Sequence, residues 1–139
     1  MAQKKASNIE FAFSAGGIVQ EKDRVLLIKT KDLKGEIVWT FPKGHVERRE
    51  RSADAALREV REETGYDCKI IKEIENVQYW FRQKGKLVKK RVKWFLMRPV
   101  EKRGEHDEEI MEIKWVQLKE AQEMLSYESD RNIVKKLNG

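Results

Sequence analysis

The sequence is poor in cysteine and proline and contains no long hydrophobic run. Among 139 residues, Cys68 is the only cysteine and two residues are proline. A lone cysteine excludes an intrachain disulfide and a cysteine-rich metal centre, and it suits a reducing compartment. No apolar stretch is long enough to span a bilayer, and the basic opening MAQKKASNIEF lacks the apolar core of a secretory leader. These absences predict a cytoplasmic protein without a membrane segment.

Charged residues, in contrast, are abundant. They make up 39% of the chain and give it a formal net charge of +6. A basic excess fits a polyanionic partner such as a nucleotide, polyphosphate or RNA, and it is equally compatible with a requirement for solubility alone. The length predicts one domain over residues 1–139 with a self-sufficient core. Either a monomer or a homodimer is compatible with the sequence.

Hydrophobic periodicity predicts more strands than helices. Apolar or alternating runs indicate strands at 11–19, 24–30, 37–41, 68–81, 87–100 and 110–116. Helical spacing indicates a helix from an N-cap at Ser52 to a stop at Gly65, followed by closing helices at 118–126 and 130–137. Strands joined by hairpins, with one helix in mid-chain, favour an α+β fold with a mixed sheet.

Two of these segments have clear inner and outer faces. In the strand at 87–100, the period of two places one set inward, Val88, Val92, Trp94 and Leu96, and another set outward, Lys89, Arg91 and Lys93. In the closing helices the residues expected to face inward are Leu118, Ala121, Leu125, Ile133, Val134 and Leu137.

The helix that begins at Ser52 carries a cluster of carboxylates. Glu59, Glu62 and Glu63 are spaced i, i+3 and i+4, so they share a flank beside the apolar stripe. Like charges at this spacing repel unless arginines or a divalent cation compensate them. Several hard oxygen ligands suit magnesium or manganese. Taken alone, the helix fits either a solvated charged surface or a metal site.

A longer pattern surrounds this helix. Gly44 is followed by five residues and Glu50, then by seven residues and the run REVREETG, which spans residues 58–65. This spacing resembles the complete Nudix box, the signature of hydrolases that cleave a nucleoside diphosphate linked to another moiety. The order of strands, hairpin, acidic loop and terminal helix is similar to that family over nearly the whole chain. The resemblance implies an α/β/α sandwich in which helices flank a central mixed sheet and the box loop and helix follow the third strand.

Two residues depart from the family pattern. Tyr66 stands where a large aliphatic residue is usual, and Arg49 replaces the glycine that often precedes the box glutamate. We expect Tyr66 to be a packing substitution. Arg49 is expected to affect the shape of the loop or its charge near the phosphates.

The resemblance also implies a role for each box residue. The metal ligands would be the carbonyl of Gly44 and the carboxylates of Glu59 and Glu63, with Glu62 in support, and the cofactor would be Mg²⁺ or Mn²⁺. Glu50 and Arg58 would form an ion pair that braces the loop against the helix and keeps the catalytic residues in place.

In many members a glutamate from a later loop completes the site, and here Glu109 takes that position. Its competitors are Glu105, Glu108 and Glu112. Glu59 and Glu109 are the candidate general bases for attack of water on phosphorus.

Substrate choice must come from residues outside the box. The stretches FPKGH, YW at 79–80 and KWFLM at 93–97 resemble the bacterial Nudix enzymes that hydrolyse diadenosine polyphosphates and release ATP. Lys43, His45 and Lys93 would contact phosphates, and Tyr79 or Trp80 would stack on adenine. Each has a structural alternative: a loop hydrogen bond for His45, core packing for the aromatics, and solubility for the seven basic residues between Arg82 and Lys93.

Three other functions share the box. A nucleoside triphosphate pyrophosphohydrolase of the MutT type would differ only in base recognition. An RNA 5′-pyrophosphohydrolase would use the basic strip to bind RNA, with a steep salt dependence. A silent Nudix module for nucleotide sensing or protein binding would normally lose a metal carboxylate, and all three helix glutamates are present here.

Overall fold

The computed structural model describes residues 9–138 of the chain. The N-terminal stretch in which the sequence predicts no secretory leader lies mostly outside these residues. The single domain expected over residues 1–139 stays a prediction. Among residues 9–138, no helix combines the length and the hydrophobicity needed to cross a membrane.

The observed elements follow the predicted order. The strands are β1 (Ile9–Glu21), β2 (Arg24–Lys31), β3 (Ile37–Thr40), β4 (Lys43–His45), β5 (Tyr66–Gln83), β6 (Lys86–Lys102) and β7 (Glu112–Gln117). The helices are α2 (Ser52–Thr64), α3 (Leu118–Met124) and α4 (Glu128–Val134).

The strands form a mixed sheet around β1. β1 pairs in parallel with β6 and antiparallel with β2 and β4, while β6 also pairs antiparallel with β5. β2 carries β3 and β7 on its two edges. This confirms the predicted α+β class with a mixed sheet flanked by helices.

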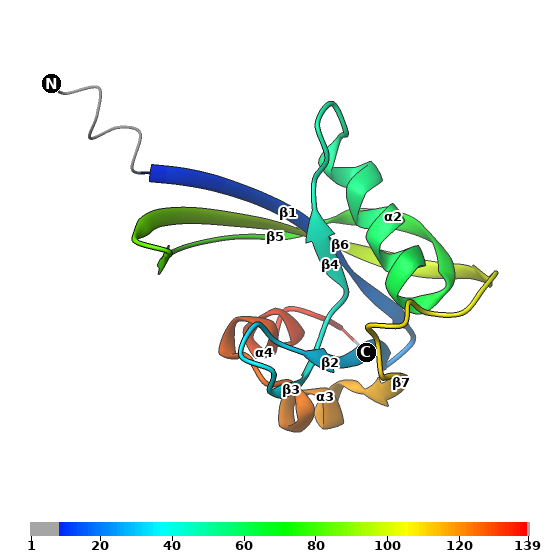
Figure 1. The fold of residues 1–139 in the computed structure, drawn as a ribbon. Helices are drawn as coiled ribbons and strands as arrows, with labels where there is room; N and C mark the ends of the chain where they lie inside the picture. The colour runs from blue at the N-terminus through cyan, green and yellow to red at the C-terminus, as the bar shows by residue number, and fades with distance from the viewer. Residues whose placement is uncertain (1–8, 139) are drawn as a thin grey trace, which may run out of the picture.

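Two hydrophobic cores lie on the two faces of β1 and β6. On one face, Ala55, Ala56 and Val60 of α2 pack with Phe95 and Met97 of β6. On the other face the buried residues come from β1, β2, β6, β7, α3 and α4 and from Phe41, and they include Ile18, Leu27, Phe41, Trp94, Val116, Ala121, Leu125, Ile133 and Val134. Figure 1 shows the resulting layers, with α2 on one side of β1, β5 and β6, and β2, β3, β7, α3 and α4 on the other.

The inward residues predicted from periodicity are confirmed. Val88, Val92 and Trp94 are buried, as are the core residues of the closing helices. Leu96, Leu118 and Leu137 are partly buried against the same core.

Three boundary details differ from the prediction. The N-cap of α2 is Arg51 in an extended conformation, and Ser52 is the first helical residue. Residues 43–45, expected in a loop, form β4, which lies between the third strand and the box helix. Ile110 and Met111 precede β7, since the amide of Ile110 closes a turn on the carbonyl of Asp107.

Gly65 ends α2 in the manner expected. It has φ +82°, and its amide donates to the carbonyl of Arg61. A β-carbon at this position would overlap the carbonyl oxygen of Gly104, which also donates its amide to Gly65. Gly65 therefore serves both a left-handed backbone and a close approach of the 103–104 loop.

Gly65→Ala and Gly35→Ala separate these two requirements. Gly35 has the same φ of +82°, but nothing lies within 4 Å of the position that a β-carbon would take there. We expect Gly35→Ala to lower the free energy of unfolding by about 1 kcal/mol, the cost of the left-handed backbone. Gly65→Ala should cost about 3 kcal/mol, because the loop must also move. Urea denaturation measures both; equal losses would show that the contact with Gly104 contributes nothing.

Candidate functional site

The box loop and the box helix meet through a bidentate ion pair. Arg58 donates from Nε to Glu50 Oε2 at 2.8 Å and from Nη2 to Glu50 Oε1 at 2.9 Å. The side chains of Arg58 and Glu50 are 27% and 17% exposed, so this pair is partly shielded from water. The pairing lowers the pKa of Glu50 to about 2, chiefly through the Arg58 hydrogen bonds. The ion pair expected from the box is therefore present.

Arg58 also contacts two of the helix glutamates. Its Nη1 lies 2.7 Å from Glu59 Oε2 and 3.1 Å from Glu62 Oε1. Nη2 donates to the carbonyl of His45 in β4 at 3.0 Å. One guanidinium thus ties together the loop, the helix and the short strand.

Gly44 lies directly against Glu59. A β-carbon at Gly44 would overlap the Glu59 carboxylate, so only glycine permits this approach. On the preceding residue, the backbone amide of Lys43 donates to Glu63 Oε1 at 3.1 Å. β4 therefore brings its backbone to both glutamates that the sequence assigns to the metal.

Burial makes these carboxylates hard to ionise. The pKa of Glu63 is raised to about 8, first by burial and then by the neighbouring charge of Glu59. Burial is also the main cause of a raised pKa at Glu59, with Glu62 and Asp107 adding to it and Arg58 opposing it. Two adjacent, partly buried carboxylates with too little positive charge between them attract a cation.

The donor set fits a hard divalent cation. It offers carboxylate oxygens from Glu59 and Glu63 and a glycine backbone that no β-carbon obstructs. Among residues 9–138, no three His, Cys, Asp or Glu side chains are already gathered at metal-binding distances. Glu59 and Glu62 are instead engaged by Arg58.

The acidic loop after β6 approaches the helix at a residue that the sequence does not single out. The amide of Asp107 donates to the carbonyl of Glu62, and the charge of Asp107 raises the pKa of both Glu59 and Glu63. Glu109 contributes its backbone carbonyl to the hydroxyl of Thr30, and its role at the site stays a prediction. The sequence offers no signal for Asp107 among so many neighbouring acids.

A cationic cluster lies beside the carboxylates. Burial is the main cause of a lowered pKa at His45, and the charges of Lys90 and Lys43 add to it. Burial and then Lys43 lower the pKa of Lys90 to about 8. Lys43 and His45 are thus gathered with Lys90, which the sequence places among the seven basic residues of the hairpin. A signal for Lys90 does exist, because it alternates in step with buried Val88 and Val92 and must share their face.

Lys93 lies on the other face of the sheet. Lys90 and Lys93 are three residues apart in β6, so their side chains point to opposite faces. The Lys93 side chain is 29% exposed, and its Nζ is 3.9 Å from Glu73 Oε1. The structure therefore does not bring Lys93 together with Lys43 and His45. Trp80 shares the face of Lys93, whereas Tyr79 is the cross-strand partner of Lys90 and shares its face.

Tyr79 belongs to a second group that continues from the cations. Its pKa is raised by burial and by Asp130, and the pKa of Tyr127 is raised by burial, with Asp130 and Tyr79 among the further causes. Asp130 is only 3% exposed, accepts a 2.6 Å hydrogen bond from Thr40 Oγ1, and is influenced by Lys43. Tyr79 and Tyr127 remain 42% and 40% exposed. The carboxylates of the box helix, the cations of β4 and β6, and the two tyrosines thus follow one another across the molecule.

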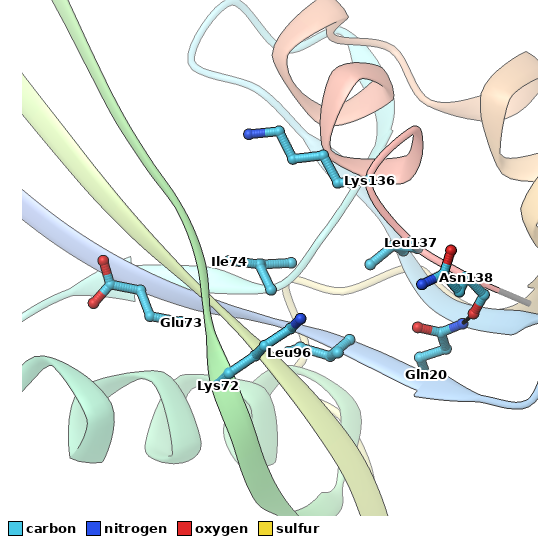
Figure 2. Close-up of a pocket in the computed structure, with 8 residues that line it drawn as sticks. All are labelled: Gln20, Lys72, Glu73, Ile74, Leu96, Lys136, Leu137 and Asn138. Carbon is cyan, nitrogen blue, oxygen red and sulfur yellow. Dashed lines mark hydrogen bonds between the residues drawn. The ribbon is translucent and has the colours of Figure 1, made fainter.

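Two surface hollows lie outside the cationic cluster. One, of about 350 Å³, is bordered by the chain end after α4 and by β1, β5 and β6 (Figure 2). The other, of about 390 Å³, borders the box helix at Arg58 and Glu62 and the loop at Asp107. Neither is lined by Lys43, His45 or Tyr79.

The two residues that depart from the box pattern differ in how well their surroundings suit them. Arg49 has φ +67°, so the arginine adopts the left-handed conformation that a glycine would take more easily. Tyr66 packs edge-on against Trp115 at 5.7 Å between ring centroids and accepts a hydrogen bond from its indole nitrogen. The expected packing role of Tyr66 agrees with this contact.

Comparison with known proteins gives a consistent result. The family model described as the NUDIX domain matches residues 10–137. The chain is 34% identical over 128 residues to the putative mutator protein MutT4 of Mycobacterium tuberculosis, covering 86% of this chain and 52% of that protein. It is 43% identical over 67 residues to the asymmetrical bis(5′-nucleosyl)-tetraphosphatase of Mus musculus, covering 45% of this chain and 44% of that protein. The chain thus spans about half the length of these relatives.

Solved structures share the fold. A NUDIX hydrolase from Nitrosomonas europaea superposes with a TM-score of 0.76 at 20% identity, over 91% of this chain and 87% of that one. An Ap4A hydrolase of C. elegans, solved as a binary complex, gives a TM-score of 0.70 at 25% identity, over 90% and 93%. Together with the box geometry and the match over residues 10–137, these findings show that the chain belongs to the Nudix family.

Proposed function

We propose that this protein is a cytoplasmic, magnesium-dependent hydrolase that cleaves the phosphoric anhydride linkage of diadenosine polyphosphates, of the tetraphosphate or hexaphosphate type, and releases ATP. The observation that carries the proposal is the position of β4: its backbone meets Glu59 and Glu63, and its Lys43 and His45 share a sheet face with Lys90 and Tyr79. Similarity to the mouse tetraphosphatase and to the C. elegans Ap4A hydrolase supports the same substrate class.

The cationic cluster suits a polyphosphate chain. Attack on an anhydride phosphorus is slow because nucleophile, electrophile and leaving group all carry or develop negative charge. Lys43, His45 and Lys90 stand next to the carboxylates and on one sheet face, where they would bind the phosphates beyond the reacting one. Their mutual repulsion, which contributes to the lowered pKa of His45 and Lys90, would be relieved by an anion between them.

The tyrosines would hold the base. Tyr79 shares its face with Lys90 as its cross-strand partner, and Tyr127 lies within electrostatic reach of it. Both keep exposed ring surface, which a purely core aromatic would not. An adenine stacked there would leave its phosphates directed towards the cations and the box.

The box residues would perform the chemistry. A divalent cation held by Glu59, Glu62, Glu63 and the Gly44 carbonyl would neutralise phosphate charge and lower the pKa of the attacking water. Glu59 would accept the proton; the hydrogen bond from Arg58 orients its carboxylate, and burial raises its pKa. Arg58 and Glu50 would keep the loop and helix aligned. Glu109 is retained as a proposed alternative base from the acidic loop.

A nucleoside triphosphate pyrophosphohydrolase is the second candidate. The M. tuberculosis relative is described as a putative mutator protein, and its similarity covers most of this chain. Such an enzyme would use the same carboxylates and cations, so base recognition and chain length alone would distinguish it.

A substrate panel tests the proposal. The protein is incubated with magnesium and diadenosine polyphosphates, nucleoside triphosphates, ADP-ribose or triphosphorylated RNA, and products are identified by chromatography. We expect ATP from diadenosine tetraphosphate with the highest kcat/KM of the panel. A preference for a modified deoxynucleoside triphosphate or for RNA would refute the substrate while leaving the box chemistry intact.

Carboxylate variants test the box chemistry itself. Glu59→Gln and Glu63→Gln should each lower kcat by roughly a thousandfold or more, because each removes a charge from the metal site. Circular dichroism checks that both variants stay folded, and Glu123→Gln, an exposed glutamate of α3, is the matched control. Turnover near that of the unaltered protein in either variant would contradict the assignment.

The raised pKa of Glu63 predicts how stability depends on pH. The folded state keeps a proton up to about pH 8 that the unfolded chain releases near its ordinary value of 4.5. The free energy of unfolding should therefore fall as pH rises between these values. In thermal unfolding experiments, the Tm of Glu63→Gln should fall less with rising pH than the Tm of the unaltered protein. Added magnesium should raise the Tm of the unaltered protein most near pH 8. A Tm in Glu63→Gln with the same pH profile as the unaltered protein would exclude Glu63 as the cause.

Lys90 and Lys93 provide a matched pair for phosphate binding, since they lie on opposite faces of β6. We expect Lys90→Met to raise KM for diadenosine tetraphosphate about tenfold, the loss of one charge-assisted contact. Lys93→Met should change KM less than about threefold, because its partner is Glu73 at the partly exposed outer face. The reverse order in steady-state kinetics would place the substrate on the other face.

A further inference from the structure

The outer half of β1 and the β5–β6 hairpin extend together beyond the layered body (Figure 1). Their registers place Phe11 and Trp80 on either side of Lys89, and Phe13 beside Arg91. We name these five residues the aromatic–basic face. Further along the same strands, the same side of the sheet is covered by α2, where Ala15, Val19, Phe95 and Met97 pack against it. The aromatic–basic face begins where α2 no longer covers the sheet.

The aromatic side chains on this face are exposed to water. Phe11 is 77% exposed, Trp80 52% and Phe13 38%. Lys89 places its Nζ 5.5 Å from the centroid of the Trp80 ring. Lysines that only keep an edge soluble would explain the cations, but they do not explain three large exposed rings beside them.

The face carries positive charge without compensation. Three stretches of paired strand contribute to this side of the sheet, at residues 9–13, 87–91 and 78–82. Their side chains on this side include Lys89, Arg91 and Arg82 and no carboxylate. Within the part of the chain that the structure describes, none of these three cations forms an ion pair. Along β5, the first carboxylate on this side is Glu73, which is paired with Lys93.

We propose that the aromatic–basic face binds single-stranded nucleic acid, with bases stacked on Phe11, Phe13 and Trp80 and phosphates held by Lys89, Arg91 and the neighbouring Arg82. Rings on two strands that flank a central strand are roughly 10 Å apart at the backbone, twice the strand spacing, so separate bases can occupy them. A sheet surface with exposed aromatic rings and adjacent cations is one on which unpaired bases stack without sequence preference.

The charges select this occupant over a second copy of the chain. Two such faces brought together would oppose Lys89, Arg91 and Arg82 with the same cations and with no acid to neutralise them. Duplex nucleic acid offers phosphates but keeps its bases stacked, so it cannot use the rings. This surface lies on the opposite side of the sheet from Lys90 and Tyr79 and does not depend on the function proposed for that site.

Fluorescence anisotropy with a labelled twelve-nucleotide probe tests the inference. The probe carries a 5′-hydroxyl, so it has no anhydride to cleave, and it is offered as single-stranded RNA, single-stranded DNA and duplex, all without metal. We expect both single strands to bind, the duplex at least about tenfold more weakly, and log affinity to fall with log salt at a slope of about −2, the value for roughly three phosphates. Equal affinity for duplex and single strand, or no binding at low salt, would overturn the proposal.

Substitutions on the same strands locate the binding. Phe11→Ala with Trp80→Ala should weaken single-strand binding about tenfold or more, whereas Trp80→Phe, which keeps a ring, should retain most of it. Lys89→Ala with Arg91→Ala should flatten the salt slope. The matched controls are Ile71→Ala with Val100→Ala and Lys69→Ala with Arg98→Ala, exposed residues at the other end of the hairpin, which should bind as the unaltered protein does.

Two further measurements distinguish this surface from the catalytic site and from a membrane-binding surface. Hydrolysis of small nucleotides should be unchanged in Phe11→Ala, because Phe11 belongs neither to the box nor to the cationic cluster. Vesicles containing phosphatidylserine replace the oligonucleotide in a parallel sedimentation assay. Binding to vesicles without binding to single strands would identify a membrane surface and refute the proposal, as would undiminished oligonucleotide affinity in Phe11→Ala with Trp80→Ala.

Discussion

The candidate site depends on the hydrogen bonds and ion pairs that the Arg58 guanidinium makes. The box loop over residues 46–51 has little buried surface of its own, so polar contacts must hold it in place. Arg58 supplies them by binding Glu50 in the loop, Glu59 and Glu62 in the helix and the carbonyl of His45. Because a lysine offers a point charge without a planar fork, it could not satisfy these directions together. The arginine therefore sets the distance between the metal loop and the metal helix.

Electrostatic compensation across the site is uneven. Arg58 neutralises the flank of the helix that carries Glu59 and Glu62, whereas Glu63 accepts a hydrogen bond from the neutral backbone amide of Lys43. On the far side of β4 the imbalance has the opposite sign, where Lys43, His45 and Lys90 repel one another. A region of crowded carboxylates thus adjoins a region of crowded cations. A bound cation would reduce the repulsion among the carboxylates, and a bound polyanion would reduce the repulsion among the cations.

The sequence predicts the long elements and misses those that tertiary contacts define. Alternation of apolar and polar residues over many positions makes β6 and its buried face predictable. Lys90 belongs to that buried face by the same alternation. It is overlooked because the run of neighbouring lysines suggests one solvated strip. β4 is three residues long and is a strand because it pairs with β1, so no local sequence pattern predicts it. Asp107 reaches the helix through its own backbone amide, a contact that composition cannot distinguish from those of Glu108 or Glu109. The Glu50–Arg58 pair, by contrast, is expected from the resemblance to the Nudix box.

The parallel pairing of β1 with β6 also governs when the molecule can fold. Ile9 pairs with Leu87 and Val19 with Met97, so β1 cannot complete its pairing until a segment 78 residues further along the chain has been made. Contacts between residues so distant in sequence are slow to form. During synthesis, β4 can already lie against β1, but the sheet that supports α2 is incomplete until β6 leaves the ribosome. The carboxylates and the loop would therefore acquire their mutual geometry late, and a nascent chain that stops before β6 would carry the entire box without a working site.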